Sequence, residues 1–121
     1  MFNPGLVLVS AGFDATEGHP PTLGGYTVSP SCFAAMTQQL TLLAEGKIVL
    51  ALEGGYVGQA VAGSVVECLK VLLGEPNTKL SSSELERQPS QQAVVDISNT
   101  ISHLVKNIYS SLLSNRACIH I

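Results

Sequence analysis

The sequence of 121 residues has few charged and few aromatic side chains. Charged residues make up 12% of it, against roughly 25% in a usual globular domain. Aromatic residues make up 5%, and tryptophan is absent. The 9 acidic residues outnumber the 6 basic residues, and this negative net charge argues against direct binding of nucleic acid. So little charge indicates that part of the surface is covered, either by a partner or by further protein of the same chain.

Disulfide patterns and apolar runs of membrane length are also missing. The three cysteines, Cys32, Cys68 and Cys118, form no CxxC pair and no disulfide framework, which favours a reducing compartment. Cys32 and Cys68 fall inside predicted helices, where small core residues are expected. No apolar run approaches the roughly 18 residues that cross a membrane. The opening MFNPGLVLVS lacks the basic region and cleavage site of a signal peptide. We therefore expect no membrane association.

Two short apolar runs predict strands that are buried in a parallel sheet: LVLVS at residues 6–10 and KIVLAL at residues 47–52. Between them, Ser29 and Pro30 form the N-cap and first position of a predicted helix, and Gly46 suits its C-terminal end. The apolar face of this helix is expected to consist of Phe33, Met36, Leu40 and Leu43.

A second helix is predicted over residues 59–73, with Val61, Val65, Leu69 and Leu72 on its apolar face. A polar linker is expected over residues 74–90, and a third helix over residues 91–113. Strands that alternate with helices indicate an α/β fold. Because two strands are too few for an independent sheet, we expect this chain to form the C-terminal part of a larger α/β domain.

Ligands of open parallel sheets bind beyond the carboxyl ends of the strands. The first predicted strand runs into SAGFDATEGHP and the second into EGGY, so both end in glycine-containing loops. Parallel neighbours bring such loops to one edge, which predicts that Asp14 and Tyr56 face one pocket. The glycines before Tyr56 favour a functional role slightly, because glycine permits positive φ and a close approach of the backbone.

Each of these residues also has a structural interpretation. Asp14 could be a turn former. His19 could be a ligand or an acid/base group, but a histidine beside two prolines is more often a loop residue with a satisfied ring. Glu53 could accept hydrogen bonds from backbone amides, and Tyr56 could pack in a core. Asp14 and His19 alone cannot make a catalytic zinc site, which takes about three protein ligands. Neither a phosphate-binding glycine motif nor a GxSxG nucleophile elbow is present.

Three segments in order carry a resemblance to a known family: LVLVSAGFDA (residues 6–15), EGHPPTLGGYTVSPSCF (residues 17–33) and IVLALEGGY (residues 48–56). Together they resemble the C-terminal part of the catalytic domain of zinc-dependent histone deacetylases of class II. The loop GHPPTLGGY is most similar to class IIa. The resemblance implies the arginase/deacetylase α/β fold, with residues 1–114 as a C-terminal portion of the domain and residues 115–121 as a divergent tail.

The resemblance also implies roles for single residues. Asp14, in GFDA, matches the last of the family's three zinc ligands. Tyr56, in LEGGY, matches the residue that donates a hydrogen bond to the substrate carbonyl beside the metal. Leu23 matches a residue that lines the acyl-lysine channel, and Gly54 and Gly55 match glycines that shape the adjacent pocket.

Two departures from the family pattern accompany these matches. The Asp-x-His pair that supplies the other zinc ligands has no counterpart in these 121 residues, so we expect this polypeptide to be inactive by itself. The vertebrate class IIa enzymes typically carry histidine at the position of Tyr56 and are weak deacetylases. In having tyrosine at this position, the sequence resembles the active classes and some invertebrate class IIa relatives.

The function that the resemblance implies is zinc-dependent hydrolysis of the N-acetyl-lysine amide in histones or other proteins. It further implies a role in chromatin and transcriptional repression with a corepressor complex, and a nuclear location with shuttling to the cytoplasm. Two alternatives stay open. One is a non-catalytic chromatin scaffold that binds acetyl-lysine or corepressors. The other is an amidohydrolase for acetylated polyamines or other small molecules, against which the class IIa-like loop argues.

Overall fold

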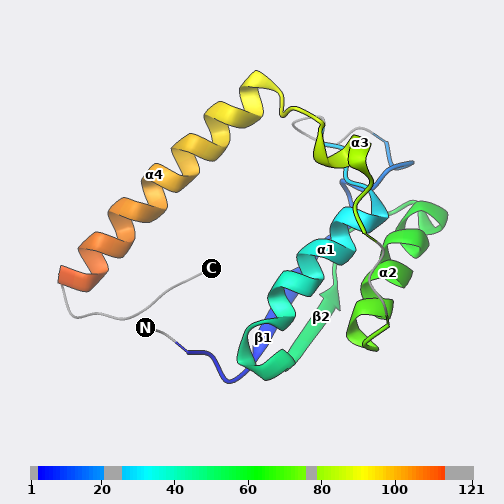
Figure 1. The fold of residues 1–121 in the computed structure, drawn as a ribbon, viewed down its shortest axis with the longest axis horizontal. Coiled ribbons are helices and arrows are strands. Elements are labelled where there is room, and N and C mark those ends of the chain that lie inside the picture. Colours follow the sequence, from blue (N-terminus) through cyan, green and yellow to red (C-terminus); the bar gives the residue numbers. More distant parts are fainter. Residues whose placement is uncertain (1–2, 21–25, 76–78, 114–121) are drawn as a thin grey trace. The chain divides into compact units, whose positions relative to one another are not determined.

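The computed structural model describes residues 3–20, 26–75 and 79–113 of the chain (Figure 1). The chain divides into two units, Met1–Leu85 and Glu86–Ile121. The first unit contains both strands and the helices that pack on them. The second unit contains one long helix.

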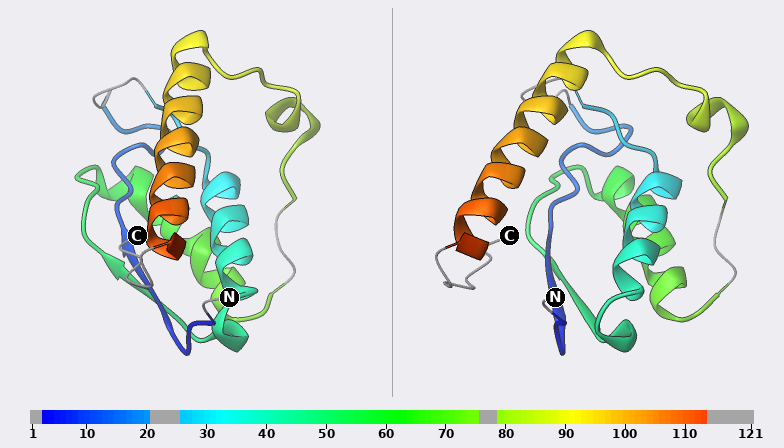
Figure 2. Two further views of the ribbon diagram at one scale, coloured as in Figure 1. Left: turned by 90° about the vertical axis from the view of Figure 1, so that its left-hand side faces the viewer. Right: turned by 60° about the vertical axis from the view of Figure 1, so that its left-hand side comes forward.

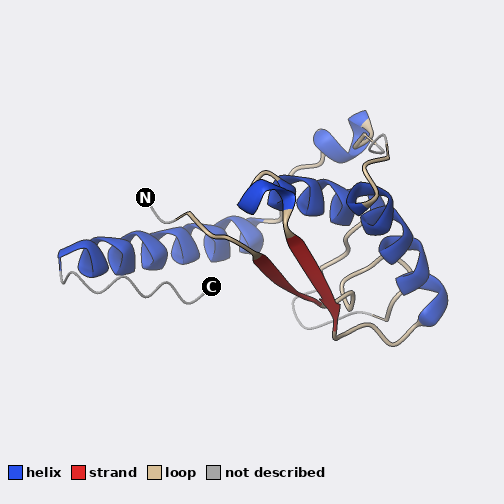
Figure 3. Ribbon diagram, turned by 90° about the horizontal axis from the view of Figure 1, so that it is seen from below, coloured by secondary structure: helices blue, strands red, loops and turns tan. Residues whose placement is uncertain are grey.

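The two predicted strands form a parallel pair. β1 (Val7–Ala11) lies beside β2 (Ile48–Leu52) in a register that pairs Val7 with Ile48 and Ala11 with Leu52. Helix α1 (Pro30–Thr41) connects them, so the sequence folds as the expected strand–helix–strand unit. Helix α2 (Gly58–Leu72) follows β2, and both helices lie on one side of the strands (Figures 2 and 3).

The hydrophobic core lies between the strands and these two helices. Its buried members are Ala11, Phe13, Val61 and Cys68, and Val9, Phe33, Leu50 and Val65 pack against them. Val9 and Ala11 of β1 take part together, because side chains alternate between the two faces of a strand. Leu8 and Val49, on the opposite face, are exposed in the part of the chain that the structure describes. Burial in an apolar setting raises the pKa of the Cys68 thiol, as expected for a core cysteine.

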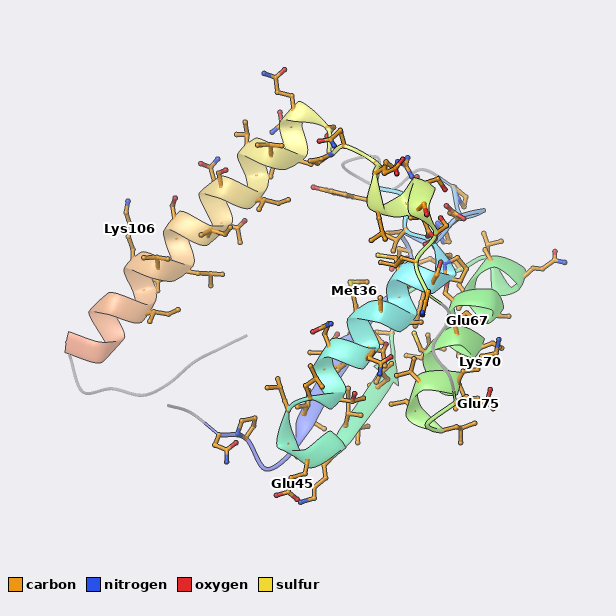
Figure 4. All side chains as sticks on the ribbon, viewed as in Figure 1. Met36, Glu45, Glu67, Lys70, Glu75 and Lys106 are labelled. Atoms are coloured by element: carbon orange, nitrogen blue, oxygen red, sulfur yellow. The ribbon has the colours of Figure 1, made fainter. Side chains whose placement is uncertain are left out.

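Helix α1 begins as predicted and ends earlier than predicted. The Ser29 side chain accepts a hydrogen bond from the backbone N–H of Cys32, and Pro30 occupies the first turn. The helix ends at Thr41, and the short 3₁₀ helix η1 (Ala44–Gly46) follows it, so Gly46 ends η1 instead of α1. The predicted apolar face is only partly right. Met36 is 47% exposed and projects from α1 (Figure 4), whereas Ala34 and Thr37 are buried.

Helix α2 packs against α1 through small residues. Ser64 and Ala34 are almost completely buried, and the Thr37 hydroxyl donates to the Cys68 sulfur at 3.3 Å. The predicted face of α2 is confirmed at Val61, which is buried, and at Val65, which packs against the core. Leu69 and Leu72 instead remain largely exposed and line an open apolar hollow of about 190 Å³ beside β2. Both leucines border open space beside β2, so they stay accessible to solvent in the part of the chain that the structure describes.

The predicted linker over residues 74–90 contains a short helix, α3 (Ser82–Leu85). The third long helix, α4 (Gln91–Leu113), has the predicted bounds, and its apolar residues from Val94 to Ile108 are about half exposed. Among the described residues, no helix has the length and hydropathy required to cross a membrane. Cys118 and the predicted tail, residues 115–121, lie outside the described residues.

Candidate functional site

The loops that follow β1 and β2 are tied together by backbone hydrogen bonds. The N–H of Glu53 donates to the carbonyl of Ala11 at 3.2 Å, and the N–H of Phe13 donates to the carbonyl of Gly54 at 2.9 Å. These two bonds extend the parallel pairing beyond the last paired residues of the strands. The prediction that both loops lie at one edge of the sheet is therefore confirmed.

The Asp14 carboxylate lies against the backbone of Gly54. A Cβ atom at Gly54 would lie 2.0 Å from Oδ2 of Asp14 and 3.0 Å from its Cγ. A Cβ atom at Gly12 would lie 3.4 Å from the same Oδ2. Two glycines from different loops thus leave the space that this half-buried carboxylate occupies. This contact explains why the first glycine of the LEGGY motif, Gly54, carries no side chain.

Gly55 packs this edge onto the core. Its φ is +116°, and a Cβ atom there would lie 2.7 Å from Cγ2 of Val61 and 3.2 Å from Cβ of Phe13. Only glycine combines such a φ with such a close approach. Phe13 is 3% exposed, and its ring centroid lies 4.8 Å from that of Phe33. The residue before Asp14 is therefore anchored in the core.

Tyr56 comes next, and its side chain is 83% exposed. Its backbone N–H donates to Nε2 of His19 at 3.1 Å, and the two ring centroids lie 6.2 Å apart with planes inclined by 55°. Nδ1 of His19 lies 3.1 Å from the carbonyl oxygen of Pro20. The structure thus brings Asp14, Gly54, Gly55 and Tyr56 to one edge and adds His19. The sequence left open whether His19 has a functional or a structural role, and no pattern in the sequence linked it to Tyr56.

The remaining polar residues near the strand ends hold the loops. The Ser10 hydroxyl donates to the carboxylate of Glu53. Thr16 is buried, and its hydroxyl forms a hydrogen bond with the hydroxyl of Ser64 on α2. The backbone of Thr16 also forms an isolated parallel β-bridge with Val28. These contacts fix where the loop after β1 leaves the sheet and where it returns to α1. Glu53 receives no catalytic role.

With this geometry established, comparison with known proteins identifies the family. The model of the histone deacetylase domain matches residues 1–72. This chain belongs to the histone deacetylase family. The similar proteins include Histone deacetylase 7 of Homo sapiens (52% identity over 93 residues, 77% of this chain and 10% of that protein). Histone deacetylase 9 of Homo sapiens is 46% identical over 100 residues (83% of this chain, 10% of that protein).

Histone deacetylase 4 of Caenorhabditis elegans is 41% identical over 121 residues, or 98% of this chain and 14% of that protein. Among solved structures, the histone deacetylase Clr3 matches with a TM-score of 0.67 and 37% identity, over 80% of this chain and 15% of that chain. The predicted arginase/deacetylase α/β fold and the similarity to class IIa are thereby confirmed. The chain spans only 10% to 15% of the length of these relatives.

The zinc that the deacetylase family implies has one candidate ligand here. Asp14 is a carboxylate at the carboxyl end of β1 and has the donor chemistry that zinc accepts. The described residues contain no group of three or more His, Cys, Asp and Glu side chains that could hold a metal ion. A catalytic zinc takes about three protein ligands, so the described part of this deacetylase domain does not fit the ion by itself. Leu23, the predicted channel residue, lies outside the described residues.

Proposed function

We propose that this chain is the C-terminal portion of the catalytic domain of a zinc-dependent protein lysine deacetylase. The complete enzyme would hydrolyse the amide of N-acetyl-lysine in histones or other proteins. The main support is that Asp14, Gly54 and Tyr56 come from two motifs of the family and meet at one edge of the sheet. Asp14 touches Gly54, and Tyr56 lies only two residues further along.

The chemistry of the site divides between the metal and the protein. In the complete domain, a bound zinc ion would supply polarisation of the substrate carbonyl and activation of a water molecule. Asp14 would supply one carboxylate ligand, and its contact with Gly54 would hold that carboxylate in place. The Tyr56 hydroxyl would donate a hydrogen bond to the oxyanion that forms from the substrate carbonyl, where such a donor is most effective.

The substrate-binding residues in this proposal are Leu23, Gly54 and Gly55. A neutral acetyl-lysine side chain suits an apolar channel, to which Leu23 would contribute its aliphatic side chain. The glycines would leave room for the acetyl group beside Tyr56. Action on chromatin within a corepressor complex, transcriptional repression, and nuclear location with shuttling are part of the same proposal and rest on the family alone.

The 121-residue chain should be inactive alone, because its described residues offer no complete set of zinc ligands. The test compares this chain with a complete deacetylase domain that contains it. Release of acetate from an acetyl-lysine peptide, abolished by a zinc chelator, is expected only from the complete domain. Turnover by the 121-residue chain would contradict the proposal.

The same assay separates the alternatives. A complete domain that binds the acetyl-lysine peptide without turnover would be a scaffold instead of an enzyme. Faster turnover of an acetylated polyamine than of the peptide would identify a small-molecule amidohydrolase. The proposed deacetylase should prefer the peptide.

A further inference from the structure

Two ring atoms of His19 make defined contacts at the candidate site. Nε2 lies 3.1 Å from the backbone nitrogen of Tyr56, and Nδ1 lies 3.1 Å from the carbonyl oxygen of Pro20. The Tyr56 nitrogen can only donate, so Nε2 must accept and carries no proton. The Pro20 carbonyl can only accept, so Nδ1 carries the proton of the neutral ring. The two partners therefore select one tautomer.

We propose that His19 is a positioning residue, which holds the backbone of Tyr56 so that its hydroxyl reaches the reacting carbonyl. This inference rests on the catalytic role proposed for Tyr56. Because both ring nitrogens are used in backbone contacts, His19 is neither a metal ligand nor a proton donor to the substrate in this arrangement. Of the two interpretations that the sequence left open, a ligand or acid/base group and a loop residue with a satisfied ring, these contacts favour the second.

The position of Tyr56 in the chain explains the need for such a contact. Gly55 is clamped between Phe13 and Val61, but helix α2 begins only at Gly58. Tyr56 lies between these two anchored points, and its side chain is 83% exposed, so packing holds it little. Its bond to His19, 37 positions earlier in the sequence, joins it to the loop that also contains Asp14. The loop that brings a zinc ligand thus also fixes the hydrogen-bond donor.

The test uses a complete deacetylase domain that contains this segment, and two variants with opposite losses. His19→Phe keeps an aromatic ring against Tyr56 but has no acceptor. His19→Gln loses the ring but keeps an amide oxygen near the position of Nε2. A misplacement of about 1 Å in an active site can cost on the order of 10²-fold in rate. We therefore expect His19→Phe to lower kcat roughly 10- to 100-fold with little change in KM, and His19→Gln to restore most of it.

Hydrogen exchange of the Tyr56 amide gives a second readout, which does not require activity. Exchange should be faster in His19→Phe than in the wild type, and slow again in His19→Gln. In a Tyr56→Phe background, His19→Phe should cause no further loss of kcat, because the group that it positions is gone.

Several results would overturn the inference. One is a His19→Phe variant with wild-type kcat and wild-type exchange at Tyr56. Another is a rise in KM alone, which would make His19 a substrate-binding residue. Failure of the proposed function looks different: Tyr56→Phe would then leave kcat unchanged, while exchange at Tyr56 would still respond to His19→Phe. If His19→Phe does not fold by circular dichroism, His19→Leu replaces it, with the same expected loss.

Discussion

The carboxylate of Asp14 occupies the space in which Gly54 would carry a side chain. A Cβ atom on Gly54 would lie 2.0 Å from Oδ2 of Asp14, a separation that non-bonded atoms do not reach. The contact joins the motif GFDA to the motif LEGGY, which are 40 positions apart at these two residues. The position of the proposed zinc ligand therefore depends on the absence of a side chain in the neighbouring loop.

Substitution of Gly54 by alanine should weaken zinc binding in a complete deacetylase domain. The added methyl group must displace the Asp14 carboxylate, because the atoms it would meet belong to that short side chain. Groups that orient metal ligands typically contribute about 10- to 100-fold in metal affinity, and we expect a loss of this size. Zinc affinity is measured by competition with a chromophoric chelator.

The matched control is Gly58→Ala at the first residue of α2, where an added Cβ meets no atom within 4 Å. This variant should keep wild-type zinc affinity, and alanine should favour the helix by roughly 0.5–1 kcal/mol. Equal zinc affinity in Gly54→Ala and Gly58→Ala would show that the Asp14 contact does not matter for the metal.

Substitution of Gly55 by alanine should destabilise the fold more than the same change at Gly74. Both residues have positive φ, +116° and +74°, so alanine is strained at either. Only Gly55 adds a collision, with Val61 at 2.7 Å, whereas Gly74 has no atom within 4 Å. Strain costs about 1–2 kcal/mol and overpacking about 1–3 kcal/mol more. Urea unfolding of the complete domain should show this excess at Gly55, and equal losses would refute the collision.

Removal of the Tyr56 hydroxyl should lower turnover without unfolding the domain. Tyr56→Phe, and equally Tyr56→His, is expected to reduce kcat on an acetyl-lysine peptide about 10²- to 10³-fold, the usual effect of losing one oxyanion donor. Stability should change little, because the side chain is exposed. Tyr26→Phe, at another exposed phenol, is the control and should retain full turnover. Unchanged turnover in both Tyr56 variants would remove the catalytic role of this residue.

Acid should weaken the contact between α3 and the start of α1. Hydrogen bonds from Ser29, then from the backbone and hydroxyl of Ser81, and then from Ser31 lower the pKa of Glu84 from 4.5 to about 2. A pKa that is lower in the folded state stabilises the fold above the unfolded value, and this contribution is lost as pH falls from 4.5 toward 2. The hydroxyl of Ser29, which caps α1, donates to the Glu84 carboxylate itself.

The measurement compares the unfolding free energy of wild type and Glu84→Gln at several pH values. Wild type should be more stable than Glu84→Gln near pH 6, and the difference should shrink as pH falls through the window from about 4.5 to 2. Glu86→Gln removes a nearby carboxylate but none of these serine contacts, and it serves as the control. A difference that stays constant with pH would contradict the assignment.

The sequence predicted the strands and their parallel pairing because each strand is a short apolar run that ends at a loop. It predicted the helix faces less well. Met36 and Leu69 were expected inside but are exposed, whereas Ala34 and Ser64 are buried. Periodicity weights large apolar residues, but α1 and α2 approach closely through small residues, which that pattern does not reveal.

The candidate site shows the same division. The sequence predicted that the loops of Asp14 and Tyr56 lie at the same edge of the sheet, because parallel neighbouring strands present the loops at their carboxyl ends on one edge. The bond between His19 and Tyr56 could not be predicted in this way. It depends on the path of the loop between β1 and α1, in which Thr16 and Val28 pair through their backbones. No local sequence pattern encodes that path.

The proposed function requires Asp14 to be a zinc ligand of a deacetylase whose remaining ligands lie outside the described residues. The most direct test measures bound zinc and acetate release from an acetyl-lysine peptide in the complete domain, for wild type and Asp14→Ala. We expect about one zinc ion per wild-type domain, as one catalytic zinc site requires. We also expect chelator-sensitive turnover, and both the bound zinc and the turnover should be lost in a folded Asp14→Ala variant. An Asp14→Ala domain that keeps its zinc and its turnover would show that Asp14 is not a ligand of the catalytic metal.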